Sequence, residues 1–231
     1  MPGLGPVPLL DPLSYPGRLL DRSALLDGER LLGAESGGFD ELLAERGAAS
    51  MDGRTGVVAV GSNGAPAQVR YKFARAGVSC VVPMVPTLVE GVSVGVSAHV
   101  SPAGYVAAAP VMGGGESSTL VLSWLDPAQL DVMDASEGRN YRRLTVPVAG
   151  GEAQMYVSLR GLLASDGVPL VAQEQPALIR GLLRGSAALR GIFGDSPESW
   201  VRVAASDSDA REEGAQVFAA EGWVRESGPY G

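Results

Sequence analysis

The feature that most constrains the fold is a series of short apolar runs between residues 56 and 160, each bounded by glycine, proline or serine. Runs of β-branched and small apolar residues between turn-forming residues are typical of β-strands. Strands at this spacing predict a closed or strongly curved sheet in the middle of the chain. The predicted strands are VVAVG, PTLVEGVSVGVSAHV, GYVAAAPV, STLVLSW, YRRLTVPV and AQMYVSL.

One segment among these strands, residues 126–138, has the pattern of a helix. Asp126 is a good N-cap residue, Pro127 suits the first helical position, and Gln129 completes a capping box. Gly138 stands where helices commonly end, because glycine adopts the left-handed conformation without strain. We therefore expect a helix between two strands.

The rest of the chain divides into two flanking regions. Residues 1–50 are a Pro/Leu-rich N-terminal extension, with five prolines up to residue 17 and then pairs of leucines. The leucine pairs predict short amphipathic helices, broken at Gly28 and at Gly37-Gly38. Residues 51–173 are predicted to be a β-rich domain and residues 174–231 a C-terminal helical region. Together these assignments predict the α+β class.

Composition limits the partners. With 26 acidic and 18 basic residues the net charge is −8, which argues against nucleic acid, because binding a phosphate backbone needs clustered basic residues. The single cysteine, Cys80, cannot form an internal disulfide, and the single histidine, His99, cannot build a histidine metal cluster. We expect His99 to be a hydrogen-bonded structural residue. No apolar stretch is long enough to span a membrane, so we expect a cytoplasmic protein with no metal and no membrane partner.

Glu137 is the first candidate for chemistry. It lies in the last turn of the predicted helix, where the helix dipole disfavours a carboxylate by about 0.3–1 kcal/mol. A residue placed against its local preference points to a function. The alternative is that Glu137 only forms an ion pair with Arg139, Arg142 or Arg143.

The second candidate is the loop GSNG, which follows the first predicted strand. Gly61 and Gly64 permit unusual backbone angles, and Ser62 and Asn63 add short polar side chains. Consecutive N–H groups in such a loop can form a concavity that binds anions. Neither GxxxxGK[ST] nor GxGxxG is present, so a simple turn remains the alternative.

These two features resemble the gamma-glutamylcyclotransferase-like family when they are taken in order. The matching segments are VVAVGSNG at 57–64 and LDPAQLDVMDASEGRNYRRLTVPV at 125–148. In that family the first strand ends in a YGSN loop. A later helix ends in Glu-Gly and is followed by a strand that carries Tyr-x-Arg and alternating valines. The resemblance covers about residues 56–160.

The resemblance implies a small mixed β-barrel-like core with flanking helices. It also implies a cofactor-independent enzyme, of the acyltransferase or lyase type, that converts a gamma-glutamyl amine or dipeptide to 5-oxoproline and releases an amine. By position in the motifs, Gly61, Ser62 and Asn63 would bind the substrate through their backbone amides. Glu137 would be the general acid/base.

One residue departs from the family pattern. Val60 stands where the family loop has tyrosine, so an aromatic ring and a hydroxyl are missing. Tyr71, Tyr105 or Tyr141 could compensate. The alternative function is a non-catalytic protein of the same fold that binds a small molecule or a protein partner. The sequence leaves the leaving amine and the oligomeric state open.

Overall fold

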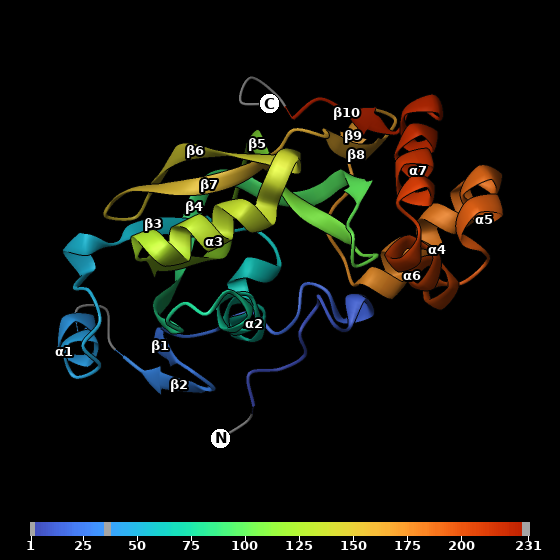
Figure 1. The fold of residues 1–231 in the computed structure, drawn as a ribbon. Helices are drawn as coiled ribbons and strands as arrows, with labels where there is room; N and C mark the ends of the chain where they lie inside the picture. Colours follow the sequence, from blue (N-terminus) through green and yellow to red (C-terminus); the bar gives the residue numbers. More distant parts are fainter. Residues whose placement is uncertain (1–2, 35–37, 228–231) are drawn as a thin grey trace.

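The computed structural model describes residues 3–34 and 38–227 and has an α+β fold. Its centre is a mixed sheet with the strand order β10-β8-β4-β5-β3-β7-β6 (Figure 1). The expected barrel-like core is wrong in one respect: within the described residues the sheet is not a closed barrel. Strand β10 (Val224–Arg225) pairs with β8 (Leu162–Ser165) and forms one edge of the sheet, while β6 forms the other. A closed barrel would require these two edge strands to pair with each other.

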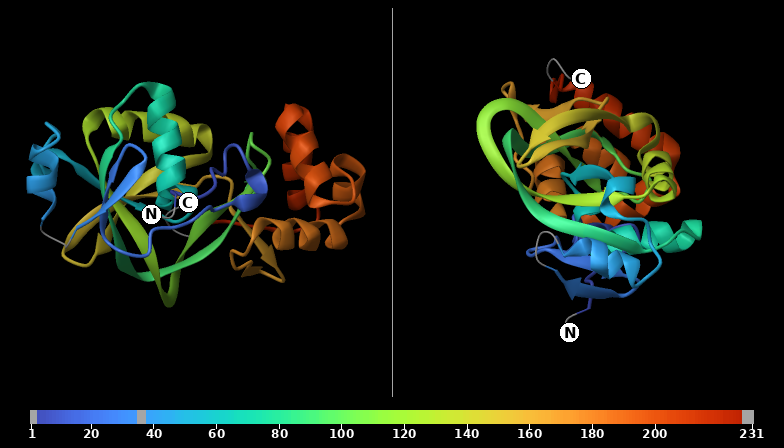
Figure 2. Two further views of the ribbon diagram at one scale, coloured as in Figure 1. Left: turned by 90° about the horizontal axis from the view of Figure 1, so that it is seen from below. Right: turned by 90° about the vertical axis from the view of Figure 1, so that its left-hand side faces the viewer.

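Two strands of 20 residues each, β4 (Val81–Val100) and β5 (Val106–Leu125), form a long antiparallel hairpin. Their pairing shifts register twice, between Glu90 and Val92 and between Val96 and Val100. Such irregularities bend a strand and increase its twist, and the hairpin curves strongly (Figure 2). The runs GYVAAAPV and STLVLSW, predicted as separate strands, are both part of β5.

The strand before the GSNG loop lies inside the sheet. β3 (Thr55–Ala59) pairs antiparallel with β5 and parallel with β7 (Gly151–Ser158). β7 in turn pairs with β6 (Tyr141–Val148), an edge strand whose bounds match its predicted run. The predicted strands of this region are therefore confirmed. Being held on both sides, β3 fixes the position of the loop that follows it.

The helix predicted after β5 is confirmed as α3 (Pro127–Glu137). Asp126 Oδ1 accepts a hydrogen bond from the N–H of Gln129 at 2.9 Å, and Gln129 Oε1 accepts one from the N–H of Asp126 at 3.0 Å. This is the capping box that the sequence predicts. The buried Gln129 amide also donates to the carbonyl oxygens of Ser79 and Val81, which ties the start of α3 to β4.

A second helix of this region, α2 (Pro66–Ala76), was not predicted. It begins with Pro66 in the first turn and ends at Gly77, which has φ of +71°. These are the same start and stop signals that identified α3. α2 follows the GSNG loop directly and lies beside α3 (Figure 1).

The helices predicted around the pairs Leu25-Leu26 and Leu31-Leu32 are wrong. Those pairs lie in β1 (Ala24–Asp27) and β2 (Arg30–Gly33), which form a hairpin turning at Gly28 with φ of +58°. β1 also pairs with β4. The backbone groups of β1 therefore bond to the sheet on both sides, which favours a strand over a helix. One short helix, α1 (Phe39–Ala44), does follow. Gly37 lies outside the described residues. The remaining short turns are η1 (Pro12–Ser14) and η2 (Met51–Gly53).

Four helices gather at one end of the sheet (Figure 1, orange to red). They are α4 (Gln175–Gly185), α5 (Ala187–Phe193), α6 (Pro197–Ser206) and α7 (Ser208–Ala220), and the short strand β9 (Val168–Pro169) precedes them. Phe193, Trp200 and Phe218 are fully buried between these helices and the adjoining parts of β4, β5 and β8. Throughout residues 3–34 and 38–227, every helix is too short or too polar to cross a membrane.

Gln175, at the start of α4, is buried and bonds to β5 as a strand would. Its Oε1 accepts from the N–H of Val106 at 2.9 Å, and its Nε2 donates to the carbonyl of the same residue at 2.8 Å. Gln173, two residues earlier, is exposed.

We predict that Gln175→Leu lowers the free energy of unfolding by about 2–3 kcal/mol, because it leaves a buried N–H and C=O without partners. Gln173→Leu, the matched control, should change it by less than about 0.5 kcal/mol. Urea unfolding of the two variants measures the difference. Equal stabilities would contradict a structural role for the Gln175 amide.

Candidate functional site

The GSNG loop is a 3₁₀ turn, η3 (Ser62–Gly64), between β3 and α2. Gly64 and Ala65 donate to the carbonyl oxygens of Gly61 and Ser62 and so close the turn. As at any helix start, the first N–H groups of the turn have no acceptor within it. The loop therefore has the N–H groups that the sequence predicts, on the wall of a pocket that Gly61, Ser62 and Asn63 line.

Glu137 is the last residue of α3, and its carboxylate reaches this loop. Asn63 Nδ2 donates to Glu137 Oε1 at 2.9 Å, although the two residues are 74 positions apart in the chain. The structure thus brings together the two sequence features that were predicted to share a site. Their roles in binding and catalysis stay predictions.

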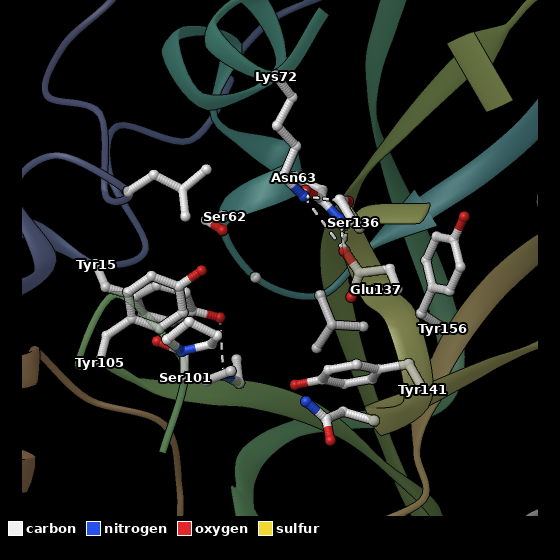
Figure 3. Close-up of a pocket in the computed structure, with 18 of the residues that line it drawn as sticks. Tyr15, Ser62, Asn63, Lys72, Ser101, Tyr105, Ser136, Glu137, Tyr141 and Tyr156 are labelled. Carbon is white, nitrogen blue, oxygen red and sulfur yellow. Dashed lines mark hydrogen bonds and ion pairs between the residues drawn. The ribbon is translucent and has the colours of Figure 1, made fainter. Parts of the chain in front are cut away.

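Lys72, from α2, completes this contact. Its Nζ donates to Asn63 Oδ1 at 2.7 Å and to Ser136 Oγ at 2.8 Å, and it lies 3.3 Å from Glu137 Oε1. The side chains of Lys72 and Glu137 are only 10% and 14% exposed. Figure 3 shows the dashed contacts converging on one carboxylate oxygen, while the other faces the pocket. We call these four residues, Asn63, Lys72, Ser136 and Glu137, the carboxylate network.

Of the arginines considered as partners of Glu137, Arg143 has a different acidic partner. Arg143 pairs instead with Asp134, with 2.9 Å between Nε and Oδ1. The side chain of Arg139 lies outside the described part of the structure. The cation paired with Glu137 is Lys72, which sequence reasoning missed.

The pocket has a volume of about 340 Å³ and collects the rare polar residue types of the chain. Lys72 is the only lysine in the sequence and His99 the only histidine, and both line the pocket. Of the six tyrosines, the five that the structure describes all line it as well. They are Tyr15, Tyr71, Tyr105, Tyr141 and Tyr156, and they come from five different segments. Figure 3 labels four of them, Tyr15, Tyr105, Tyr141 and Tyr156.

Tyrosine rings suit such a wall because the ring packs as an apolar surface while the hydroxyl reaches a polar partner. Burial, together with the Glu137 carboxylate, raises the pKa of Tyr105 to about 12. Burial also raises the pKa of Tyr15 and of Tyr141 well above the ordinary value. These phenols stay protonated near neutral pH and offer hydrogen-bond donors to a ligand.

The three tyrosines considered as substitutes for the missing loop tyrosine all line the pocket and are all half-buried: Tyr71, Tyr105 and Tyr141. Arg75 lies over the Tyr71 ring, 5.7 Å from its centre, and donates to its hydroxyl at 3.3 Å. Tyr15, which belongs to the N-terminal extension and was not predicted to take part, lies directly against the loop at Gly61.

His99 is held by a buried row of hydroxyl groups. Its Nδ1 lies 2.7 Å from Ser97 Oγ, which lies 2.7 Å from Ser158 Oγ, and Ser158 Oγ accepts from the N–H of Arg160 at 3.0 Å. Burial, reinforced by the Arg160 charge, lowers the pKa of His99 to about 4. The imidazole is therefore neutral at pH 7. The expected hydrogen-bonded environment is confirmed.

Within the described residues, no group of three or more His, Cys, Asp and Glu side chains is placed to hold a metal ion. Cys80 is partly buried and is not among the residues that line the pocket. Burial raises the pKa of its thiol. The candidate site is therefore the tyrosine-lined pocket with the carboxylate network on one wall.

Comparison with known proteins adds one structural similarity. No protein-family model matches the chain, and no curated protein matches it. The chain is similar to the solution structure of At3g28950.1 from Arabidopsis thaliana, at 21% identity and a TM-score of 0.36. The similarity covers 46% of this chain and 62% of that chain, so it spans less than two thirds of the plant protein. A likeness of this size assigns neither a family nor an activity.

The carboxylate network predicts a measurable coupling between Lys72 and Glu137. In a double-mutant cycle with Lys72→Met and Glu137→Gln, we expect a coupling energy of about 1–3 kcal/mol, because both side chains are largely buried. The control cycle uses Arg143→Met and Asp134→Asn, a more exposed pair that should couple by less than about 1 kcal/mol. Urea unfolding measures both. Equal coupling in the two cycles would contradict the network.

His99 predicts a pH dependence of stability. Its folded pKa of about 4 lies below the ordinary 6.5, so the unfolded chain takes up the proton first as the pH falls. The stability contribution of the neutral ring is complete above about pH 6.5 and is lost as the pH falls toward 4.

We expect wild type to lose about 2 kcal/mol more stability than His99→Gln between pH 7 and pH 5. Urea unfolding at the two pH values measures this. Because all other titrating groups are common to both proteins, an identical loss would show that His99 does not titrate in this way.

Proposed function

We propose that this protein is a gamma-glutamylcyclotransferase-like enzyme. It would cyclise a gamma-glutamyl amine or dipeptide to 5-oxoproline and release an amine, with Glu137 as general acid/base. The observation that supports this proposal is the 2.9 Å hydrogen bond between Asn63 and Glu137, which puts the carboxylate and the GSNG loop on one pocket. We also propose that β3, β7, α2 and α3 correspond to the family core.

The chemistry requires one base, one set of oxyanion donors and a close fit. A gamma-glutamyl compound carries an α-ammonium group, which becomes a nucleophile only after it loses a proton. Glu137 would take that proton, and the amine would attack the γ-carbonyl carbon to close a five-membered ring. The N–H groups of the GSNG loop would stabilise the oxyanion. Glu137 would then return the proton to the departing amine.

The pocket has features that suit this substrate. Both reacting groups belong to one molecule, so holding it in a bent conformation accelerates ring closure by proximity. The cations Lys72 and Arg75 on the pocket wall complement the α-carboxylate of a gamma-glutamyl group. The tyrosine rings limit the access of water, which strengthens the electrostatic contacts of the bound molecule.

The second candidate is a protein of this fold that binds a small molecule and does not react with it. The Lys72–Glu137 ion pair favours this alternative, because a proton on Glu137 would cancel its attraction to Lys72. In an enzyme, substrate binding would therefore have to weaken the pair, for example because the α-carboxylate of the substrate binds Lys72. A binding protein would keep the pair intact.

We predict that Glu137→Gln lowers the rate of 5-oxoproline formation by about 10²–10⁴-fold, because general acid–base catalysis contributes that much. The assay follows 5-oxoproline with a panel of gamma-glutamyl amines and dipeptides. The matched control is Asp131→Asn, which neutralises an exposed carboxylate on the same helix and should leave the rate unchanged.

The panel also separates the two candidates. If wild type binds a gamma-glutamyl compound but forms no 5-oxoproline from any of them, the binding function replaces the enzyme. If an active wild type and Glu137→Gln have equal rates, Glu137 is not the acid/base.

A further inference from the structure

The N-terminal segment before β1 is part of the pocket wall. The N–H of Leu9 donates to Gln68 Oε1 on α2 at 3.2 Å, and the N–H of Leu20 donates to the carbonyl of Gly64 at 3.3 Å. These bonds anchor the segment on either side of Tyr15. The segment runs next to the start of α2 (Figure 2, blue).

Tyr15 is the residue that this segment inserts beside the GSNG loop. Its side chain is buried, at 6% exposure, and its ring stacks on Tyr105 with 4.4 Å between ring centres. Its hydroxyl is so close to Gly61 that a Cβ atom built there would lie 2.1 Å from it. The loop therefore requires glycine at position 61, because any side chain would displace the Tyr15 hydroxyl.

The hydrogen bonds of this hydroxyl determine where its proton can go. The N–H of Ala108 donates to Tyr15 Oη at 2.7 Å. A backbone N–H can only donate, so the oxygen accepts this bond and its own O–H is left to donate. Among the described residues no acceptor for this proton is found, and Tyr15 lines the pocket.

We propose that Tyr15 donates a hydrogen bond to the γ-carbonyl oxygen of the bound gamma-glutamyl compound and to the oxyanion that forms from it. This inference rests on the proposed function and adds a residue to it. The hydroxyl lies beside the loop whose N–H groups are proposed to hold the same oxygen. It also supplies, from a distant segment, the hydroxyl that Val60 lacks.

Two further observations agree with this role. Burial raises the pKa of the Tyr15 hydroxyl far above the ordinary value. The hydroxyl is therefore protonated near neutral pH and can donate a hydrogen bond. The buried Ser101 hydroxyl, which lies beside Tyr105, also lines the pocket and can bond to a ligand. The pocket thus has polar groups that a ligand would satisfy.

The test compares Tyr15→Phe with Ser14→Ala. The first removes only the hydroxyl and keeps the stacked ring. The second removes a neighbouring hydroxyl that bonds locally to the Asp11 carbonyl at 2.6 Å and does not line the pocket. We expect Tyr15→Phe to lower kcat about 10²-fold with little change in KM, because losing one oxyanion donor has an effect of this size. Ser14→Ala should behave as wild type.

Calorimetric titration with 5-oxoproline separates this inference from the proposed function. If wild type is active and Tyr15→Phe has the same kcat, the inference is wrong and the function stands. If wild type forms no 5-oxoproline, the function is wrong, and the titration decides about Tyr15. Binding weakened at least tenfold in Tyr15→Phe would then support the donor role, whereas equal binding, or none to wild type, would overturn it.

A second variant covers the case in which Tyr15→Phe does not fold. Gly61→Ala keeps the tyrosine but displaces its hydroxyl, so it should lower kcat and weaken 5-oxoproline binding in the same way. Wild-type kinetics and binding in Gly61→Ala would overturn the inference.

Discussion

The buried carboxylate of Glu137 is the constraint on which the arrangement of the pocket depends. It lies at the C-terminal end of α3, where the helix dipole already disfavours negative charge, and it is largely removed from water. Donors must therefore come from elsewhere in the chain. Asn63 and Lys72 supply them, and both belong to the unit formed by β3, the GSNG loop and α2. One charge thereby fixes the positions of α2, α3 and the GSNG loop relative to one another.

The same network bears on the choice between an enzyme and a binding protein. In the free protein Lys72 has acceptors at Asn63, Ser136 and Glu137, so its ammonium group is fully used. Such a network rigidifies a site when every member is satisfied. A rigid site suits a transition state that needs exact positioning, and it also suits a ligand that is only held. The protein is an enzyme rather than a binding protein if a substrate can replace one of the acceptors of Lys72.

Much of the fold could be predicted because its signals are local. The capping box of α3 and the apolar runs of β3, β6 and β7 each depend on neighbouring residues. The hairpin of β1 and β2 could not, because paired leucines fit both helix and strand periods and the pairing with β4 decided between them. In the site, short motifs predicted the Gly61–Asn63 loop and Glu137. Lys72 and Tyr15 lie in no motif, so the sequence did not identify them as site residues. The one available signal for Lys72 was that it is the single lysine of the chain.

The placement of Tyr15 has a consequence for the order in which the molecule forms. Its hydroxyl bonds to a backbone group 93 positions later in the chain, and its ring stacks on Tyr105. Contacts between such distant segments form slowly, since long loops must close first. The segment that carries Tyr15 precedes the β4–β5 hairpin in the chain and must therefore wait for the hairpin before it can complete the pocket. A folding intermediate could have a formed sheet and still have no binding site.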